Sequence, residues 1–314
     1  MINRENWKAV RAYLNYRREV DLISLASISL EKTWLAHLLT WAHEKHFSMA
    51  PGLRPSFPAY IRDQNFSPVY TAHVVRAARR FFVWVSKHRP GFSMSAAWLD
   101  TLKVPSMVIE DKKHQAITIE EIRAIAAAPV ATIRERRVRA AAVFWFLSGI
   151  RIGAFVTLPV SAVDLHRLTV NQFPRLGVHT KFKKHATTFL LNIPDLLEVV
   201  QAWDKEVRAA GSHYWFAACD PDTGKIDASI SAVGKHRNNR ARKDLENWLH
   251  RVGLPYYSPH KFRHGFAVYA LKQAKTVKTL KAISQNLMHS SIKTTDSIYS
   301  ILDDLDVGDE IKSL

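Results

Sequence analysis

Apolar residues recur at helical spacing over most of the first hundred positions. Between Glu31 and Phe47 an apolar stripe with intervals of three and four predicts an amphipathic helix. A second helix is predicted to begin at Ser67-Pro68, an N-cap serine followed by a first-turn proline, and to end at Pro90-Gly91. The two apolar faces consist of Trp34, Leu35, Leu38 and Ala42, and of Val74, Val75, Ala78, Phe81, Phe82 and Val85. This part of the chain is therefore expected to be a helical domain.

The periodicity disappears after residue 102 and resumes at Thr118. There Thr118 and Glu121 have the spacing of a capping box, which predicts the start of a new helix. We therefore expect a helical domain at 1–102, a linker at 103–116 and a second domain at 117–299. The last segment, 300–314, carries five acidic residues and one lysine and is expected to be an acidic tail.

The second domain mixes helical and strand-like patterns. A helix is predicted at Ile133–Leu147, ending at Ser148-Gly149, and two more at Leu196–Val207 and Val233–Val252. Strand-like segments at 177–180 and 187–191 flank a charged turn. The expected fold is mainly α with a small β-sheet.

The charge of the chain narrows the classes of function. Of 314 residues, 45 are Lys or Arg and 28 are Asp or Glu, a formal net charge of +17. Such an excess indicates a polyanionic partner, nucleic acid first and an anionic membrane surface second. The single cysteine, Cys219, excludes an internal disulfide framework and a zinc site built on several thiolates. The N-terminus does not resemble a signal peptide and the longest strongly apolar run is 140–147, so we expect a soluble cytoplasmic protein.

Four short segments carry candidate chemistry. Arg151 follows a glycine helix stop, where a chain reversal and a new helix start would favour an anion. Lys181, Lys183 and Lys184 lie in the charged turn; such a cluster usually serves solubility, but a lysine there could also donate a proton to a leaving oxygen.

The other two segments lie near the end of the chain. His260, Arg263 and His264 share one face of a predicted helix N-terminus after Ser258-Pro259, which suits a phosphate better than a metal cation. His289 precedes a polar stretch that ends at Tyr299, a residue that alone would be interpreted as a packed aromatic.

In this order the segments resemble the tyrosine recombinase (phage integrase) family. The resemblance covers roughly residues 30–305 and implies a helical core-binding domain followed by a mixed catalytic domain. It further implies a site-specific DNA recombinase that cleaves and rejoins DNA through a 3′-phosphotyrosyl intermediate, without a cofactor or a metal. The implied catalytic residues are Arg151, Lys181, His260, Arg263, His289 and the nucleophile Tyr299, with Lys183 or Lys184 as alternatives to Lys181.

The chain departs from the family pattern at three points. Ala154 stands where an acidic residue is usual, Met288 stands where glycine is usual, and ten residues rather than nine separate His289 from Tyr299. Ala154 and Met288 keep open the alternative of a DNA-binding protein of this fold that does not cleave. A second alternative is an enzyme similar to type IB topoisomerases, which share the chemistry of the arginines, lysine, histidine and tyrosine.

The resemblance also implies partners. We expect double-stranded DNA at a recombination site, a tetramer on that DNA, no membrane, a nucleoid-associated location, and a tail that docks on a neighbouring protomer. Target sequence, direction of recombination, host and accessory DNA-bending proteins are left open. The cations expected to contact DNA are Arg76, Arg79, Arg80, Lys87, Lys183, Lys184, Lys235, Arg237, Arg240 and Lys261.

Overall fold

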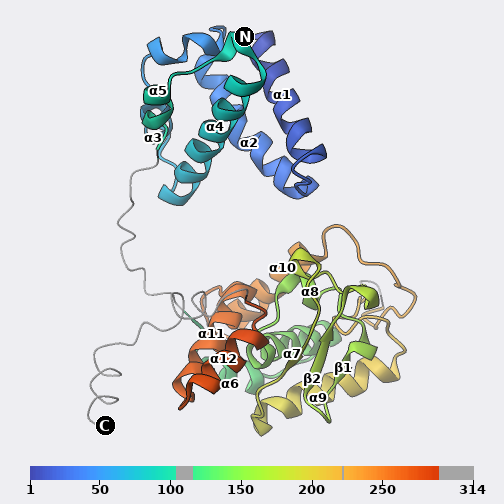
Figure 1. Ribbon diagram of the computed structural model, residues 1–314. Helices are drawn as coiled ribbons and strands as arrows, with labels where there is room; N and C mark the ends of the chain where they lie inside the picture. The colour runs from blue at the N-terminus through green and yellow to red at the C-terminus, as the bar shows by residue number, and fades with distance from the viewer. Residues whose placement is uncertain (104–115, 221–222, 290–314) are drawn as a thin grey trace. The chain divides into compact units, whose positions relative to one another are not determined.

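The computed structural model describes residues 1–103, 116–220 and 223–289, and the chain divides into two compact units, Met1–Asp111 and Lys112–Leu314 (Figure 1). Most of the predicted linker, 103–116, and the whole predicted tail lie outside the described residues. The domain limits derived from the sequence therefore stay predictions.

The N-terminal unit is helical. Its helices are α1 (Arg4–Glu19), α2 (Leu25–Ala42), α3 (Phe57–Arg62), α4 (Pro68–His88) and α5 (Ala96–Thr101). The helix predicted from Ser67 is confirmed, since the Ser67 hydroxyl accepts a hydrogen bond from the Tyr70 N–H and all six predicted apolar residues of α4 are buried. The helix predicted at Glu31–Phe47 is α2, which begins and ends earlier, because Ser24 caps it and His43 leaves the helical region with φ 51°.

A buried carboxylate joins three helices of this unit. Glu31 of α2 is 3% exposed and accepts hydrogen bonds from Tyr13 and Arg17 of α1 and from Arg80 of α4. The two arginines offset the cost of burying its charge. Arg80, one of the predicted DNA contacts, thus has a structural partner inside the unit.

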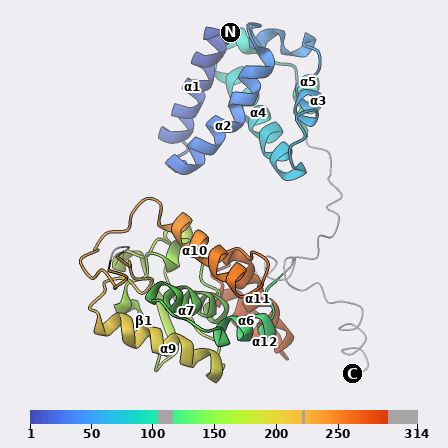
Figure 2. The same cartoon turned by 180° about the vertical axis from the view of Figure 1, so that it is seen from behind.

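The C-terminal unit is built around one buried helix, α7 (Ile133–Ser148). Almost every α7 residue from Arg137 onward is buried, and α7 contacts α6, α9, α10 and α11 (Figure 2). The helices of this unit are α6 (Ile119–Ala127), α7, α8 (Ile152–Phe155), α9 (Pro194–Ala209), α10 (Arg237–Arg251), α11 (Pro259–Lys272) and α12 (Val277–Asn286). The predicted capping box of Thr118 and Glu121 is present at the start of α6.

The sheet of this unit is small and antiparallel, in the order β1-β2-β3. Its strands are β1 (Val163–Asp164), β2 (Thr169–Gln172) and β3 (Ala186–Phe189), and Thr169 pairs with Phe189. The fold class predicted from the sequence, mainly α with a small sheet, is confirmed.

The strand predicted at 177–180 is wrong, and the one predicted at 187–191 lies at Ala186–Phe189 instead. The partner of β3 is β2, which lies earlier in the chain and ends before Pro174. Proline has no N–H for the ladder, and Gly177 then turns the chain with φ 82°, so the segment after it cannot continue the strand.

The predicted helices at 196–207 and 233–252 appear as α9 and α10 with shifted limits. Proline starts α9 two residues earlier than predicted. The helix α10 begins only at Arg237, because the segment before it, with Gly234, forms a turn.

Candidate active site

A buried arginine lies at the centre of the candidate site. Arg263 of α11 is 3% exposed; its Nη1 donates to the Gly149 carbonyl at 2.5 Å, and its Nη2 donates to the Leu287 carbonyl and to His289 Nε2, the latter at 3.0 Å. A guanidinium is planar and permanently charged, so these partners fix both its position and its orientation. Arg263 thereby joins α11 to the end of α7 and to the end of α12.

Gly149 makes this arrangement possible. It ends α7 in the left-handed region with φ 61°, where other residues are strained. A Cβ at this position would lie 2.8 Å from Leu287 Cδ2 and 2.9 Å from Phe266 Cδ1. Glycine therefore allows α11 and α12 to approach the end of α7 closely enough for Arg263 to reach the Gly149 carbonyl.

Arg151 follows two residues later as the N-cap of α8. The sequence predicted that a helix start would reinforce this anion site. Because α8 has only four residues, its dipole contributes little there, and the chain reversal at Gly149 is what places the Arg151 side chain.

The pKa of His289 depends on the charges that surround its imidazole. Burial, and then the charges of Arg263, Arg151, His260 and Lys184, lower the pKa of its imidazole to about 4. The ring is therefore neutral near pH 7. Since arginine can only donate, Nε2 of His289 is the acceptor of the Arg263 bond, and the proton of the neutral ring lies on Nδ1.

This electrostatic coupling shows which predicted residues the fold brings together. Arg151, His260, Arg263 and His289 come from α8, α11 and the chain after α12, and the charges of the first three act on His289. Tyr299, the predicted nucleophile, lies outside the described residues, and its position stays a prediction.

His260 lies at the second position of α11 and is exposed, whereas His264 is buried. Their rings are in edge-to-face contact, with centroids 4.5 Å apart and planes at 88°. The predicted common face is therefore present. Proline occupies the first turn as expected, but the Ser258 side chain makes no cap hydrogen bond.

The three lysines of the turn before β3 differ in exposure. Lys181 and Lys183 are exposed, while Lys184 is half-buried and its charge is among those that lower the pKa of His289. The Lys181 ammonium lies 5.1 Å from the centroid of the Phe182 ring. The sequence left the choice among these lysines open; the partial burial of Lys184 and its effect on His289 favour this residue, and the choice stays a prediction.

Two further residues, which the sequence analysis missed, hold the site together. The buried Thr157 hydroxyl accepts a hydrogen bond from the His179 N–H at 2.8 Å and donates to carbonyls of α8, at Gly153 or Ala154. Thr157 thereby joins α8, which begins at Arg151, to the chain that leads into the lysine turn. No local pattern could have revealed it, because the partner is 22 residues away.

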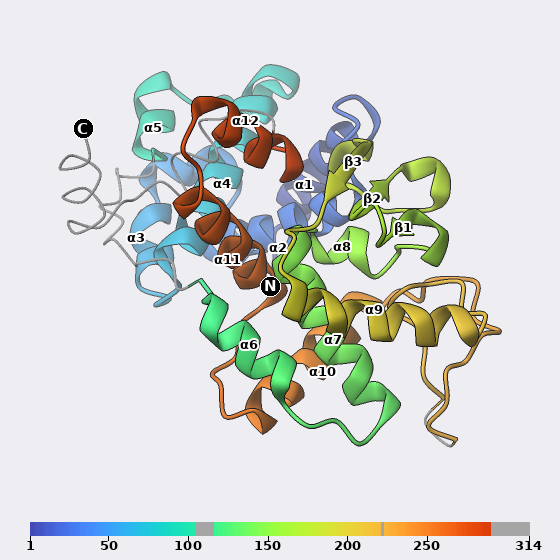
Figure 3. The ribbon, with the colours of Figure 1, turned by 90° about the horizontal axis from the view of Figure 1, so that it is seen from below.

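Asn286 forms the second link. Its side-chain amide accepts from the Phe189 N–H at 2.7 Å and donates to the Phe189 carbonyl at 3.0 Å, as a neighbouring strand would. This attaches the end of α12 to β3 (Figure 3). His289 follows three residues after Asn286, so its distance from the sheet is fixed by this pair.

The structure shows what the departure at Met288 costs. Met288 has φ 52°, in the left-handed region where glycine costs nothing and other residues cost about 1–2 kcal/mol. The turn is closed by hydrogen bonds from the Met288 N–H to the Gln285 carbonyl and from the His289 N–H to the Ser284 carbonyl. Ala154, the other departure in the described residues, is buried in α8.

Several predicted DNA contacts already have partners inside their own unit. Arg79 bonds to the Leu99 carbonyl and pairs with Asp100, and Arg240 pairs with Asp244 at 3.5 Å. Arg237 bonds to the Val156 and Phe216 carbonyls. Arg76, Lys87, Lys183 and Lys235 are exposed, as are Arg80 and Arg240, which pair with carboxylates. DNA contact stays a prediction for all of them and for Lys261.

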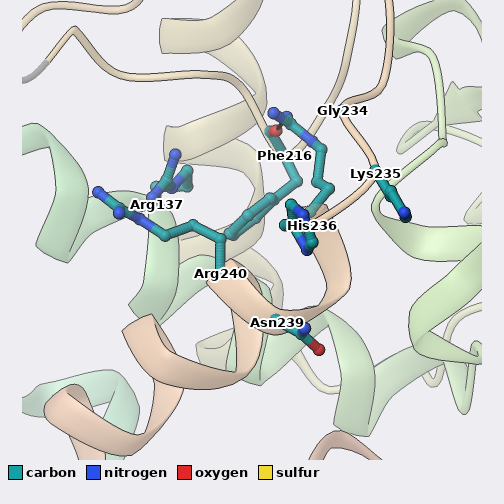
Figure 4. Close-up of a pocket in the computed structure, with 8 residues that line it drawn as sticks. Arg137, Phe216, Gly234, Lys235, His236, Asn239 and Arg240 are labelled. Carbon is teal, nitrogen blue, oxygen red and sulfur yellow. Dashed lines mark hydrogen bonds between the residues drawn. The ribbon is translucent and has the colours of Figure 1, made fainter.

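The cations before and in α10 line a hollow of about 580 Å³ (Figure 4). Its floor includes Phe216 and the buried Arg137, which pairs with Asp244 at 2.6 Å. The other lining residues are Gly234, Lys235, His236, Arg237, Asn239 and Arg240. The hollow contains none of the residues that surround His289.

Two searches of the described parts of the chain gave no candidates. In residues 1–103, 116–220 and 223–289, no three His, Cys, Asp or Glu side chains gather as a metal-ligand group. In the same ranges no helix combines the length and the apolar character needed to cross a bilayer.

The Thr157 link predicts a local effect. In Thr157→Val the His179 N–H loses its acceptor, so we expect hydrogen exchange at the His179 amide to accelerate about fivefold, equivalent to a cost of about 1 kcal/mol. Thr157→Ser, which keeps the hydroxyl, is the control and should retain most of the protection. Equal exchange in Thr157→Val and the unchanged protein would contradict the link.

The environment of His289 predicts its titration. Because its pKa in the folded protein is about 4, below the ordinary value of 6.5, the ring should remain neutral at pH 5 in an NMR titration. The unfolded chain takes up this proton first, so the contribution of His289 to stability is present above pH 6.5 and is lost as the pH falls through 4. His289→Gln assigns the resonance, and a midpoint near 6.5 would rule out the proposed environment.

Comparison with known proteins identifies the family of this chain. Residues 115–305 match the model of the phage integrase family. A tyrosine recombinase XerC of Roseiflexus sp. is 23% identical over 266 residues, covering 82% of this chain and 76% of the relative. A XerC of Natranaerobius thermophilus is 28% identical, covering 78% of this chain and 75% of the relative.

Solved structures share the fold. The lambda integrase dimer bound to a COC′ core site has a TM-score of 0.64 at 11% identity, covering 93% of this chain and 76% of that one. The XerH recombinase bound to a palindromic difH substrate has a TM-score of 0.64 at 14% identity, with coverage of 96% and 83%. The family match spans more than half of the chain, and the chain therefore belongs to the phage integrase family of tyrosine recombinases, the enzymes that break and rejoin DNA in site-specific recombination.

Proposed function

We propose that this chain is a cleavage-competent site-specific recombinase whose nucleophile is Tyr299. The observation that carries the proposal is the buried guanidinium of Arg263, which bonds to His289 at 3.0 Å and to the Gly149 carbonyl, two residues before Arg151. The charges of Arg151, His260 and Lys184 also act on His289. Such a group of cations and imidazoles matches the charge of a backbone phosphate in its transition state.

The chemistry follows from the residue types. The phenol oxygen of Tyr299 attacks phosphorus while the bond to the 5′ oxygen breaks. One phosphate ester thus replaces another, and the free energy of the phosphodiester bond is conserved in the intermediate. Arg151 and Arg263 compensate the charge on the non-bridging oxygens, and His289 donates to one of them through Nδ1–H. His260 exchanges a proton with the phenol, and Lys184 gives a proton to the leaving oxygen.

The partners of this reaction are double-stranded DNA and other copies of the chain. The net charge of +17 supports DNA binding, and the exposed cations Arg76, Lys87, Lys183 and Lys235 are the first phosphate contacts to test. Exchange of strands between two duplexes requires four protomers, and the acidic segment 300–314 is proposed to dock on a neighbouring protomer. Deletion of 303–314 tests this docking, because it should impair synapsis.

The nucleophile is tested with a nicked suicide substrate, which traps the covalent intermediate. Tyr299→Phe removes the attacking oxygen, so we expect no covalent protein–DNA product on a denaturing gel. DNA affinity should be retained, because one uncharged hydroxyl contributes little to phosphate binding. The control is Tyr256→Phe, which removes the phenol of an exposed tyrosine before α11 and should still form the adduct.

The outcomes separate the alternatives. An adduct with Tyr299→Phe would assign the nucleophile to another residue. Absence of an adduct with the unchanged chain, together with specific binding, would favour a DNA-binding protein that does not cleave. Relaxation of supercoiled DNA without sequence preference would favour an enzyme similar to type IB topoisomerases.

The general acid is tested with a substrate in which sulfur replaces the 5′ bridging oxygen. On ordinary DNA, Lys184→Ala should slow cleavage by about 10²–10⁴-fold, and Lys181→Ala by much less. A thiolate leaves without a proton, because a thiol has a pKa of about 8.5. The sulfur substrate should therefore restore the rate of Lys184→Ala but not that of Arg263→Lys. Restoration of Lys181→Ala instead would assign the acid to Lys181.

A further inference from the structure

An aromatic side chain projects from the lysine turn. Phe182 lies between Lys181 and Lys183 and is 79% exposed. Burial of a phenyl ring is ordinarily favourable, and leaving it in water forgoes about 1.5–3 kcal/mol. The ring thus lies beside three cations and is available to a partner.

The backbone holds Phe182 in this position at a cost. Phe182 has φ 60° and ψ 24°, and Lys183 has φ 53°, so two successive residues with side chains occupy the left-handed region. The turn is closed by a hydrogen bond from the Thr180 hydroxyl to the Lys184 carbonyl and by one from the Lys183 N–H to the Thr180 carbonyl. Such strain in bulky residues concentrates at functional sites.

The position of the turn defines what the ring can reach. The turn begins directly after His179, whose N–H donates to the Thr157 hydroxyl at 2.8 Å and is thereby attached to α8, the helix that begins at Arg151. The charge of Lys184, two residues after Phe182, also lowers the pKa of His289, so the turn lies near the phosphate-binding groups. If the proposed function holds, the lysines contact phosphates there. A phenyl ring cannot bond to phosphate, so its available partners are the apolar faces of the bases and sugars.

Exposure and backbone strain alone do not distinguish Phe182 from other residues of the chain. Leu22, in the turn between α1 and α2, is 81% exposed and has φ 53°, but it follows Asp21 and is not among lysines. What distinguishes Phe182 is the combination of an aromatic ring, three neighbouring lysines and the electrostatic link to the site. Leu22 is therefore the matched control.

We propose that Phe182 inserts as a wedge into the base stack of the DNA beside the cleaved phosphate. The proposal rests on the proposed function and extends it from phosphate chemistry to the choice of cleavage position. An apolar wedge unstacks one base step, and flexible pyrimidine–purine steps unstack at least cost. The ring would thereby favour cleavage next to such a step without a hydrogen bond to any base.

The wedge is tested by the fluorescence of 2-aminopurine placed in turn at each position around the cleavage site, in the Tyr299→Phe background so that the DNA stays intact. The chain with Phe182 should raise the fluorescence several-fold at one step, because the probe unstacks there. Phe182→Ala should abolish this rise, whereas Phe182→Trp should keep it.

The salt dependence of binding separates the ring from the lysines. Phe182→Ala removes no charge, so the slope of log K against log salt should not change. Lys183→Ala should reduce the slope by about 0.9 if that lysine neutralises one phosphate. An altered slope in Phe182→Ala would overturn the assignment of an uncharged contact.

The strain provides a second, independent measurement. Asparagine tolerates the left-handed region, so Phe182→Asn and Leu22→Asn should each raise Tm, by about 2 °C. Only Phe182→Asn should also reduce the cleavage rate and weaken the preference for cleavage next to particular base steps. Equal cleavage in both variants, or an unchanged 2-aminopurine signal in Phe182→Ala, would overturn the wedge.

The experiments distinguish an error in the wedge proposal from an error in the proposed recombinase function. With Tyr299 present, Phe182→Ala should still form the covalent adduct, more slowly and with weaker preference for position. An adduct at the unchanged rate and position would overturn the wedge and leave the recombinase intact. Absence of any adduct with the unchanged chain would refute the proposed function itself.

Discussion

The site depends on the buried guanidinium of Arg263, which bonds to main-chain carbonyls at the ends of two other helices. A buried charge without partners is costly, so the fold is stable only when the end of α7, the body of α11 and the end of α12 come together around it. Gly149 allows this approach because it has no Cβ to meet Leu287 and Phe266. The same contact that satisfies the arginine therefore places Arg151 and His289, which follow Gly149 and Leu287 by two residues each.

The other links extend this arrangement to the sheet. Thr157 attaches α8 to the chain before the lysine turn, and Asn286 attaches the end of α12 to β3. Together with Arg263 they connect every segment that carries a candidate catalytic group among the described residues. Preorganisation of this kind is what electrostatic catalysis requires, since groups that must move into place during the reaction lose part of their effect.

Local signals in the sequence predicted a large part of this structure. The serine cap of α4, the capping box of α6 and the glycine stop of α7 each depend on residues within a few positions, and each is confirmed. The strand predicted at 177–180 failed because alternation alone does not identify a strand's partner, and Pro174 and Gly177 outweighed it. Thr157, Asn286 and the distinct position of Lys184 depend on contacts between distant segments, which a single sequence does not encode locally.

The partners of Arg263 described above differ from those of two other arginines. Arg137 pairs with Asp244 and Arg80 with Glu31, which are carboxylates. The described hydrogen bonds of Arg263 go to two carbonyls and a neutral imidazole, and they fix the position of its guanidinium. The low pKa of His289 fits these contacts, because a protonated imidazole would repel Arg263 and could not accept its hydrogen bond.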